Sequence, residues 1–301
     1  MSAVGGVLST VGGVGLISLA ARDIFDALFH PEGRGSLSRR VMRFVWRLFR
    51  RAAPGPRTFP LAGPVGLVAV VGSWVVLLVL GWALLFWPHI PDGFNYAHPD
   101  QRGPALVDAF NLSLVSLTTL GFGDVTPKAE WLRFVVPLEA LVGFGLLSAS
   151  ISWLLLTYPV LSRRRSLAYE ISLLRKAEDD TALALDRLEP EAAERVYAEL
   201  ASRLVAVERD LVNFPVSYYF AETDERFSLP AAVPYLMTLA ERGANEEMPE
   251  RLRLRALLLL EALDDLAATT GRRFLGLTGG STPDMLAAYA RDHLREPETP
   301  R

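Results

Sequence analysis

The heptapeptide TTLGFGD, residues 118–124, lies between two long apolar runs of this chain. A row of backbone carbonyls can replace the water shell of a dehydrated cation only if every carbonyl turns toward one axis. Such a row needs backbone conformations that residues with a Cβ resist and that glycine adopts freely. Gly121 and Gly123 supply this freedom, while Leu120 and Phe122 can point away from the axis and hold the loop in place. The segment is therefore a candidate cation pathway lined by peptide oxygens.

With an apolar helix expected on each side, TTLGFGD resembles the selectivity-filter signature of potassium channels. The resemblance covers residues 61–160, roughly a third of the chain. It implies an ion-binding filter formed by Thr119, Leu120, Gly121, Phe122 and Gly123. In this filter the Thr119 hydroxyl and backbone carbonyls would bind K⁺, and Asp124 would lie at the outer mouth. Phe122 stands where tyrosine is commoner, and its phenyl ring cannot donate a hydrogen bond behind the filter.

The expected fold class is an all-α membrane protein with a potassium-channel pore module. Residues 61–87 carry no charge, and residues 131–160 are interrupted only by Arg133 and Glu139. Each run exceeds the roughly 20 apolar residues that a spanning helix needs. Residues 104–117 predict a helix about 20 Å long, which is too short to cross. The partial negative charge at its C-terminus would point toward the filter and favour a cation there.

The second apolar run would form the inner helix of the pore. By its distance from the filter, Gly143 matches the gating-hinge glycine of the potassium-channel family, and a packing contact is an equal alternative. Pro159 can bend this helix or end it. Four residues follow Gly143 at helical spacing and are candidate cavity-lining positions: Leu147, Ser150, Ile151 and Leu154.

Glu139 is costly in hydrocarbon and is expected to find a partner behind the filter or in a neighbouring subunit. We favour a structural role for it over ion binding. Some relatives carry a carboxylate four residues before Thr119, where this chain has Val115. Slow filter inactivation through that carboxylate is therefore not assumed.

The distribution of arginines predicts how the chain is oriented in the membrane. Eight arginines lie between residues 34 and 57, and Arg163, Arg164 and Arg165 follow the second run. The positive-inside rule places both blocks in the cytoplasm and the filter toward the outside. Membrane anchoring and phosphate contact explain the arginines more simply than a specific regulatory-lipid site.

Two further segments precede the pore module. Residues 3–29 carry a stripe of small residues that permits close helix packing, and we expect an extra span with its N-terminus outside. A helix lying in the interface is the alternative. In residues 37–49 apolar side chains alternate with arginines at helical spacing, which predicts a basic amphipathic helix on the inner membrane surface.

From Ser162 onward the composition becomes charged and rich in alanine and leucine. Helical periodicity marks residues 167–188, 192–211, 231–240, 252–268 and 285–294, with prolines between these segments. A cytosolic helical bundle is expected, without the nucleotide-binding fold of many prokaryotic potassium channels. The predicted domains are 1–60 (apolar and amphipathic helices), 61–160 (pore module) and 161–301 (cytosolic domain).

The composition excludes several function classes. The chain has 301 residues, 50% of them hydrophobic, and no cysteine, so disulfides and thiolate metal sites are excluded. No nucleophile–base pair or phosphate loop indicates an enzyme. Because one filter segment cannot enclose an ion, several chains are needed, and the resemblance to potassium channels implies that four of them form a C4 homotetramer. Membrane lipid and K⁺ are the expected partners, with K⁺ as the permeant ion, no cofactor and no nucleic acid.

We therefore expect a K⁺-selective channel subunit, an integral protein of a prokaryotic plasma membrane with a cytoplasmic C-terminal domain. Two alternatives stay open. One is a non-selective cation channel of the same fold, and the other is a membrane signalling or scaffold protein that does not conduct.

Overall fold

A computed structural model describes residues 3–28, 35–53, 55, 57–98, 100, 102–181 and 183–294. The chain forms two compact units, which are described separately below. Unit 1 comprises Met1–Val41 and Leu67–Leu155, and unit 2 comprises Met42–Gly66 and Leu156–Arg301. Among the described residues, three helices are long and apolar enough to cross a membrane, as their length and composition indicate: α1 (Ala3–Leu28), α3 (Ala62–Phe86) and α5 (Leu132–Thr181).

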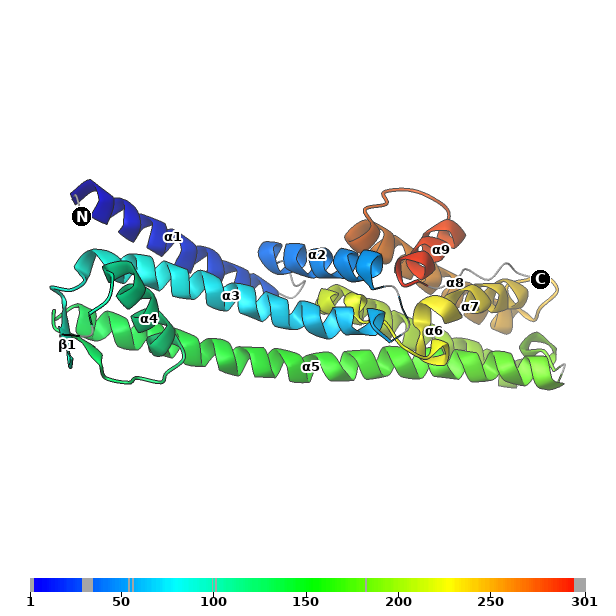
Figure 1. The fold of residues 1–301 in the computed structure, drawn as a ribbon. Helices are drawn as coiled ribbons and strands as arrows, with labels where there is room; N and C mark the ends of the chain where they lie inside the picture. The colour runs from blue at the N-terminus through cyan, green and yellow to red at the C-terminus, as the bar shows by residue number, and fades with distance from the viewer. Residues whose placement is uncertain are drawn as a thin grey trace. The chain divides into compact units, whose positions relative to one another are not determined.

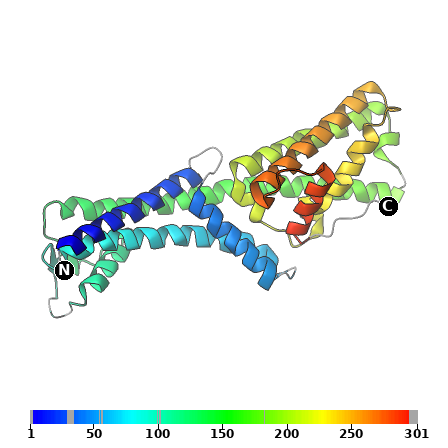
Figure 2. The same cartoon turned by 90° about the horizontal axis from the view of Figure 1, so that it is seen from above.

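In unit 1, α1 packs along α3 through small residues (Figures 1 and 2). The Ser9 hydroxyl donates to the Leu84 carbonyl at 2.7 Å. A Cβ on Gly13 would lie 2.5 Å from the Gly81 carbonyl oxygen, so the two backbones meet only because both residues are glycine. This packing favours the extra span over the interfacial helix. The predicted last residue of that span, Phe29, lies outside the described residues.

A buried carboxylate joins the end of α1 to the start of α2 (Ser36–Ala52). Asp23 accepts hydrogen bonds from the Leu37 N–H at 2.7 Å, the Ser38 N–H at 3.0 Å and the Trp74 indole at 2.9 Å. It thereby satisfies two of the backbone donors that the first turn of α2 leaves without helical partners. This cap could not be predicted from the sequence, because Asp23 is not next to the helix that it caps.

The amphipathic helix α2 presents three faces rather than two. Phe44 is 67% exposed and Leu48 49%, as expected for side chains that face lipid. Met42, Val45 and Trp46 are buried within unit 2 instead, and the Trp46 indole donates to Asp292 at 2.9 Å. The prediction of a helix lying on the membrane surface is therefore incomplete, since Val45 faces protein.

The second apolar run continues beyond its predicted end. Helix α5 includes Pro159 and runs to Thr181, so that it contributes residues to both units, whereas an end near residue 160 and a new helix at 167 were expected. A proline removes one helical hydrogen bond and costs about 3 kcal/mol. Buried side chains continue along the helix on both sides of this position, and their packing offsets that cost: Thr157, Val160, Leu161, Leu167, Ala168 and Ile171.

Unit 2 contains four further helices that agree with the predicted segments to within a few residues: α6 (Pro190–Asn213), α7 (Leu229–Gly243), α8 (Glu250–Thr270) and α9 (Thr282–Asp292). Prolines stand at or next to the start of each, where a missing N–H is tolerated. Shorter helical turns are η1 (Phe59–Leu61), η2 (Trp87–His89), η4 (Leu185–Arg187), η5 (Pro215–Tyr219), η6 (Glu225–Phe227) and the π-helix η7 (Gly271–Leu275).

The core of unit 2 lies between α6, α7 and α8. Helices α6 and α8 run in the same direction, because Glu194 pairs with Arg255 at 3.4 Å and Glu208 accepts from Thr269 at 2.7 Å, the same sequence offset in both cases. The buried Tyr197 hydroxyl donates to the Leu239 carbonyl of α7 at 3.0 Å.

The arginines that follow the second apolar run contact protein carboxylates in unit 2. Arg163 pairs with Asp210 through two contacts of 2.8 Å, and Arg165 pairs with Glu222 at 2.8 Å. Arg164 is buried and donates to the Ser217 carbonyl at 2.6 Å. The expectation that these three side chains contact lipid phosphates is therefore corrected.

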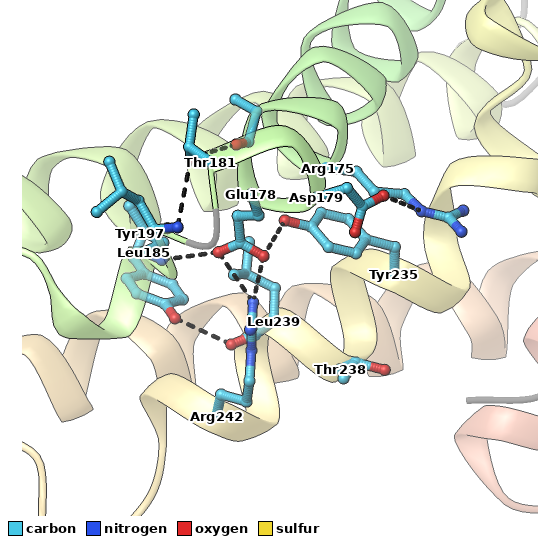
Figure 3. Close-up of polar contacts among 12 residues, drawn as sticks. Arg175, Glu178, Asp179, Thr181, Leu185, Tyr197, Tyr235, Thr238, Leu239 and Arg242 are labelled. Carbon is cyan, nitrogen blue, oxygen red and sulfur yellow. Dashed lines mark hydrogen bonds and ion pairs between the residues drawn. The ribbon is translucent and has the colours of Figure 1, made fainter. Parts of the chain in front are cut away.

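A polar cluster ties the end of α5 to α7, and Figure 3 shows its members. The Glu178 carboxylate accepts from the Leu185 N–H at 2.7 Å, the Tyr235 hydroxyl at 2.8 Å and the Arg242 guanidinium at 2.8 and 3.1 Å. Both carboxylate oxygens thus have partners. We call these four residues the Glu178 cluster.

Candidate functional site: the loop between α4 and α5

The short helix before the heptapeptide is α4 (Ala105–Leu117), which begins one residue later than predicted, with Pro104 as its N-cap. Asp108 lies in its first turn and accepts from the Gly103 N–H at 3.3 Å and the Tyr96 hydroxyl at 2.9 Å. A carboxylate at a helix N-terminus interacts favourably with the helix dipole. The C-terminus of α4 leads directly into Thr118, so the negative end of the dipole lies at the start of the loop.

Helix α4 is held from two sides inside unit 1. The Ser113 hydroxyl oxygen lies 3.1 Å from the Val79 carbonyl of α3 and 2.5 Å from Glu139 Oε1 of α5. Gly143 of α5 lies against the last residue of α4, because a Cβ built on it would be 1.8 Å from the Leu117 carbonyl oxygen. Of the two roles expected for Gly143, the packing contact is present.

The inner end of the loop is bonded to α4. The Thr118 N–H donates to the Leu114 carbonyl at 3.1 Å, and the Thr119 N–H donates to Ser116 at 2.9 Å. The Leu120 N–H reaches back to the Val115 carbonyl at 3.1 Å. Val115 thus positions the loop through its backbone, although its side chain offers no carboxylate.

Backbone handedness alternates along the loop. Thr119, Gly121 and Gly123 have φ angles of +59°, +57° and +77°, whereas the residues between them do not have positive φ. The left-handed region is uncommon for a residue with a Cβ and open to glycine. In a β-strand, successive groups point to alternate sides of the chain. When every second residue is left-handed instead, successive peptide units can turn their carbonyls to the same side.

A small sheet fixes the outer end of the loop. Strand β1 (Phe94–Tyr96) pairs antiparallel with β2 (Val125–Pro127), with Tyr96 opposite Val125. The Ala97 N–H then donates to the Asp124 carbonyl at 2.8 Å. Burial and the hydrogen bond to Asp108 raise the pKa of Tyr96 to about 12, so this phenol stays neutral and keeps donating at physiological pH.

Every residue from Thr118 to Asp124 is exposed on the single chain. Leu120 and Phe122 are 62% and 69% exposed, so they make little contact with their own chain, and the expectation that they hold the loop in place stays a prediction. Among the candidate cavity residues, Leu147, Ile151 and Leu154 are exposed as well, and Ser150 is half-buried. Large apolar surfaces of this kind are covered by another molecule or by lipid.

The predicted site residues therefore fall into two groups. The filter residues Thr119 to Gly123 and Asp124 form one continuous loop, while Glu139 and Gly143 lie behind it against α4. Sequence reasoning missed Ser113 and Tyr96. A serine inside an apolar helix beside a buried carboxylate was the available signal for Ser113, whereas strands of three residues gave no signal for the Tyr96 region.

Comparisons with known proteins add one finding. Residues 71–155 match a family model described as "Ion channel", which covers less than a third of the chain and includes the whole loop and both contacts of α5 with α4. Neither the curated proteins nor the solved structures that were compared include a match. The chain thus carries an ion-channel domain, and its long apolar helices make it a membrane protein.

Proposed function

We propose that this protein is a subunit of a K⁺-selective channel, in which four copies of the loop 119–123 surround a common axis and conduct K⁺ passively. The observation that carries the proposal is the alternating handedness at Thr119, Gly121 and Gly123. In a filter of this class, backbone carbonyls replace the hydration shell of K⁺. The Thr119 hydroxyl adds a further oxygen at the inner end.

Three features support this function. The loop is bonded to α4 at its inner end and joined to β2 at its outer end, which reduces the entropy that ordering it would cost. Its apolar side chains are open to a neighbouring copy. The dipole of α4 directs partial negative charge to the place where a cation would pass.

An assembly of several chains follows from the single loop, and we propose four chains because the resemblance to potassium channels implies that number. One loop supplies oxygens on one side of an ion only, so several chains are needed to enclose it. Cyclic symmetry brings identical loops to one axis. In that arrangement Leu120 and Phe122 contact the neighbouring subunit, which accounts for their exposure on one chain.

The test is K⁺ flux into liposomes that contain the purified wild-type protein or Gly121→Ala. Alanine at φ +57° strains the filter by about 1–2 kcal/mol and disturbs the carbonyl row. Gly276→Ala is the matched control, because Gly276 has φ +72° and open space around it but lies in unit 2. We expect flux from wild type and Gly276→Ala and at least a tenfold loss in Gly121→Ala.

Two results would contradict the proposal. Absence of flux from the wild-type protein would favour the scaffold alternative. Equal loss in Gly121→Ala and Gly276→Ala would show that backbone strain, and not the filter, controls the flux.

A further inference from the structure

Two residues of α5 face two residues of α4 in matching positions. Glu139 and Gly143 are four residues apart, as are Ser113 and Leu117. Residues at i and i+4 share one face of a helix. Glu139 meets Ser113 and Gly143 meets Leu117, so one ridge of each helix lies against the other.

The first contact is polar and buried. Ser113 and Glu139 are fully buried, and the Ser113 hydroxyl also reaches the Val79 carbonyl. Among the described residues, Glu139 Oε2 has no hydrogen-bond partner. A buried polar group costs several kcal/mol in an apolar environment unless it is bonded. Moving α4 by about 1 Å would break the bond, because hydrogen bonds weaken beyond roughly 3.2 Å.

The second contact is steric and lies one residue before the filter sequence begins. The Leu117 carbonyl occupies the space that a side chain at position 143 would need. Leu117 is followed directly by Thr118 and Thr119, whose N–H groups bond to the last turn of α4. The position of α4 along this ridge therefore sets where the filter carbonyls start.

We infer that Ser113 and Glu139 are positioning residues. Together with the Gly143–Leu117 contact, they fix the pore helix α4 against the inner helix α5 and thereby set the ion selectivity of the filter. This inference rests on the proposed function. The Ser113–Glu139 bond fixes the position of α4 along α5, and the contact of Gly143 with Leu117 fixes how closely the two helices approach. Neither side chain touches the permeant ion.

The test is the ratio of K⁺ to Na⁺ permeability, obtained from reversal potentials of the purified full chain in planar bilayers. We expect Ser113→Ala and Glu139→Leu each to lower the ratio about tenfold, which corresponds to roughly 1.4 kcal/mol. The double variant should lose no more than the stronger single variant, because both remove the same bond. Glu139→Gln should retain the wild-type ratio, since its amide can still both donate and accept.

Two matched controls separate positioning from general damage to the membrane helices. Ser73→Ala removes a hydroxyl whose hydrogen bond, within the described residues, goes to the Val70 carbonyl of its own helix at 2.7 Å. Gly145→Ala adds a methyl group two residues from Gly143, where nothing lies within 4 Å. Both should keep the wild-type ratio, whereas Gly143→Ala should lose selectivity or assembly.

If Ser113→Ala fails to assemble, Ser113→Cys replaces it, because a thiol keeps nearly the same volume and bonds weakly. We expect a loss of about threefold from that variant. A selective wild type with unchanged ratios in Ser113→Ala and Glu139→Leu overturns this inference alone. A wild type that does not discriminate K⁺ from Na⁺ overturns the proposed function and this inference with it.

Discussion

Two glutamates of α5 are partnered in opposite ways. Glu178 in unit 2 accepts from a guanidinium, a phenol and a backbone N–H, so both of its oxygens are satisfied. Within the described part of the chain, Glu139 in unit 1 has one bonded oxygen, whose partner is the Ser113 hydroxyl. The first is an ion pair that stabilises the fold of its unit. The second is a single contact with a hydroxyl that locates one helix against another in an apolar region.

The largest expected effect is that of Glu178→Gln. The amide of glutamine has no charge to pair with Arg242, whose half-buried guanidinium therefore loses the carboxylate of Glu178. The amide also turns an N–H₂ group toward the groups that donate to Glu178. We expect a loss of about 2–3 kcal/mol in the free energy of unfolding, measured by urea denaturation of the detergent-solubilised protein. Asp179→Ala is the control, because its ion pair with Arg175 is 3.8 Å long and exposed, and a change below about 0.5 kcal/mol is expected there.

Tyr235→Phe removes one bond of the same cluster and keeps its charge pair. Burial and the hydrogen bond to Glu178 raise the pKa of Tyr235 above its usual value, so the hydroxyl is a permanent donor below pH 10. We expect a loss of about 1 kcal/mol in the same denaturation measurement. A loss equal to that of Glu178→Gln would contradict the view that the ion pair contributes most of the stability of the cluster.

Tyr96 provides a second tyrosine–carboxylate bond, with Asp108, beside the C-terminal end of the loop 118–124. Its pKa is raised to about 12, so its contribution to stability is fully present below about pH 10 and is lost as the pH rises through about 12. Absorbance titration at 295 nm should show one phenol fewer ionising near pH 12 in Tyr96→Phe than in the wild type. If the phenol that is missing from the Tyr96→Phe titration is one that ionises near pH 10, then Asp108 does not raise the pKa of Tyr96.

The smallest effect is expected from Glu139→Gln. Its amide can donate to Ser113 while the Ser113 hydroxyl donates to Val79, so the contact is kept. The free energy of unfolding of the detergent-solubilised protein should change little, by less than about 0.5 kcal/mol, in a thermal unfolding measurement. A large loss here would mean that Glu139 acts as a charge, as Glu178 does, and the distinction between the two glutamates would fail.

Much of the helical organisation could be predicted from periodicity and proline positions. Helices α6 to α9 begin and end close to where the pattern changes, because each has one apolar face and a proline at its start. The continuity of α5 could not be predicted. The composition changes at Ser162 and Pro159 precedes it, but the tertiary packing that carries the helix onward involves residues remote in the sequence.

The loop itself was predicted better than its surroundings. The spacing of Gly121 and Gly123 already implied left-handed backbone, and the structure adds Thr119 to that pattern. The need of Glu139 for a partner followed from its place in an apolar run, but the choice of Ser113 depends on how α4 and α5 cross. The cap that Asp23 makes on α2 and the pairing of β1 with β2 join segments that carry no local signal.

The most direct measurement is the reversal potential of the wild-type protein in a bilayer with K⁺ on one side and Na⁺ on the other. A row of backbone carbonyls at the alternating positions of the loop predicts a strongly shifted potential, with K⁺ permeability far above that of Na⁺. A potential near zero, with the two ions equally permeant, would contradict the account.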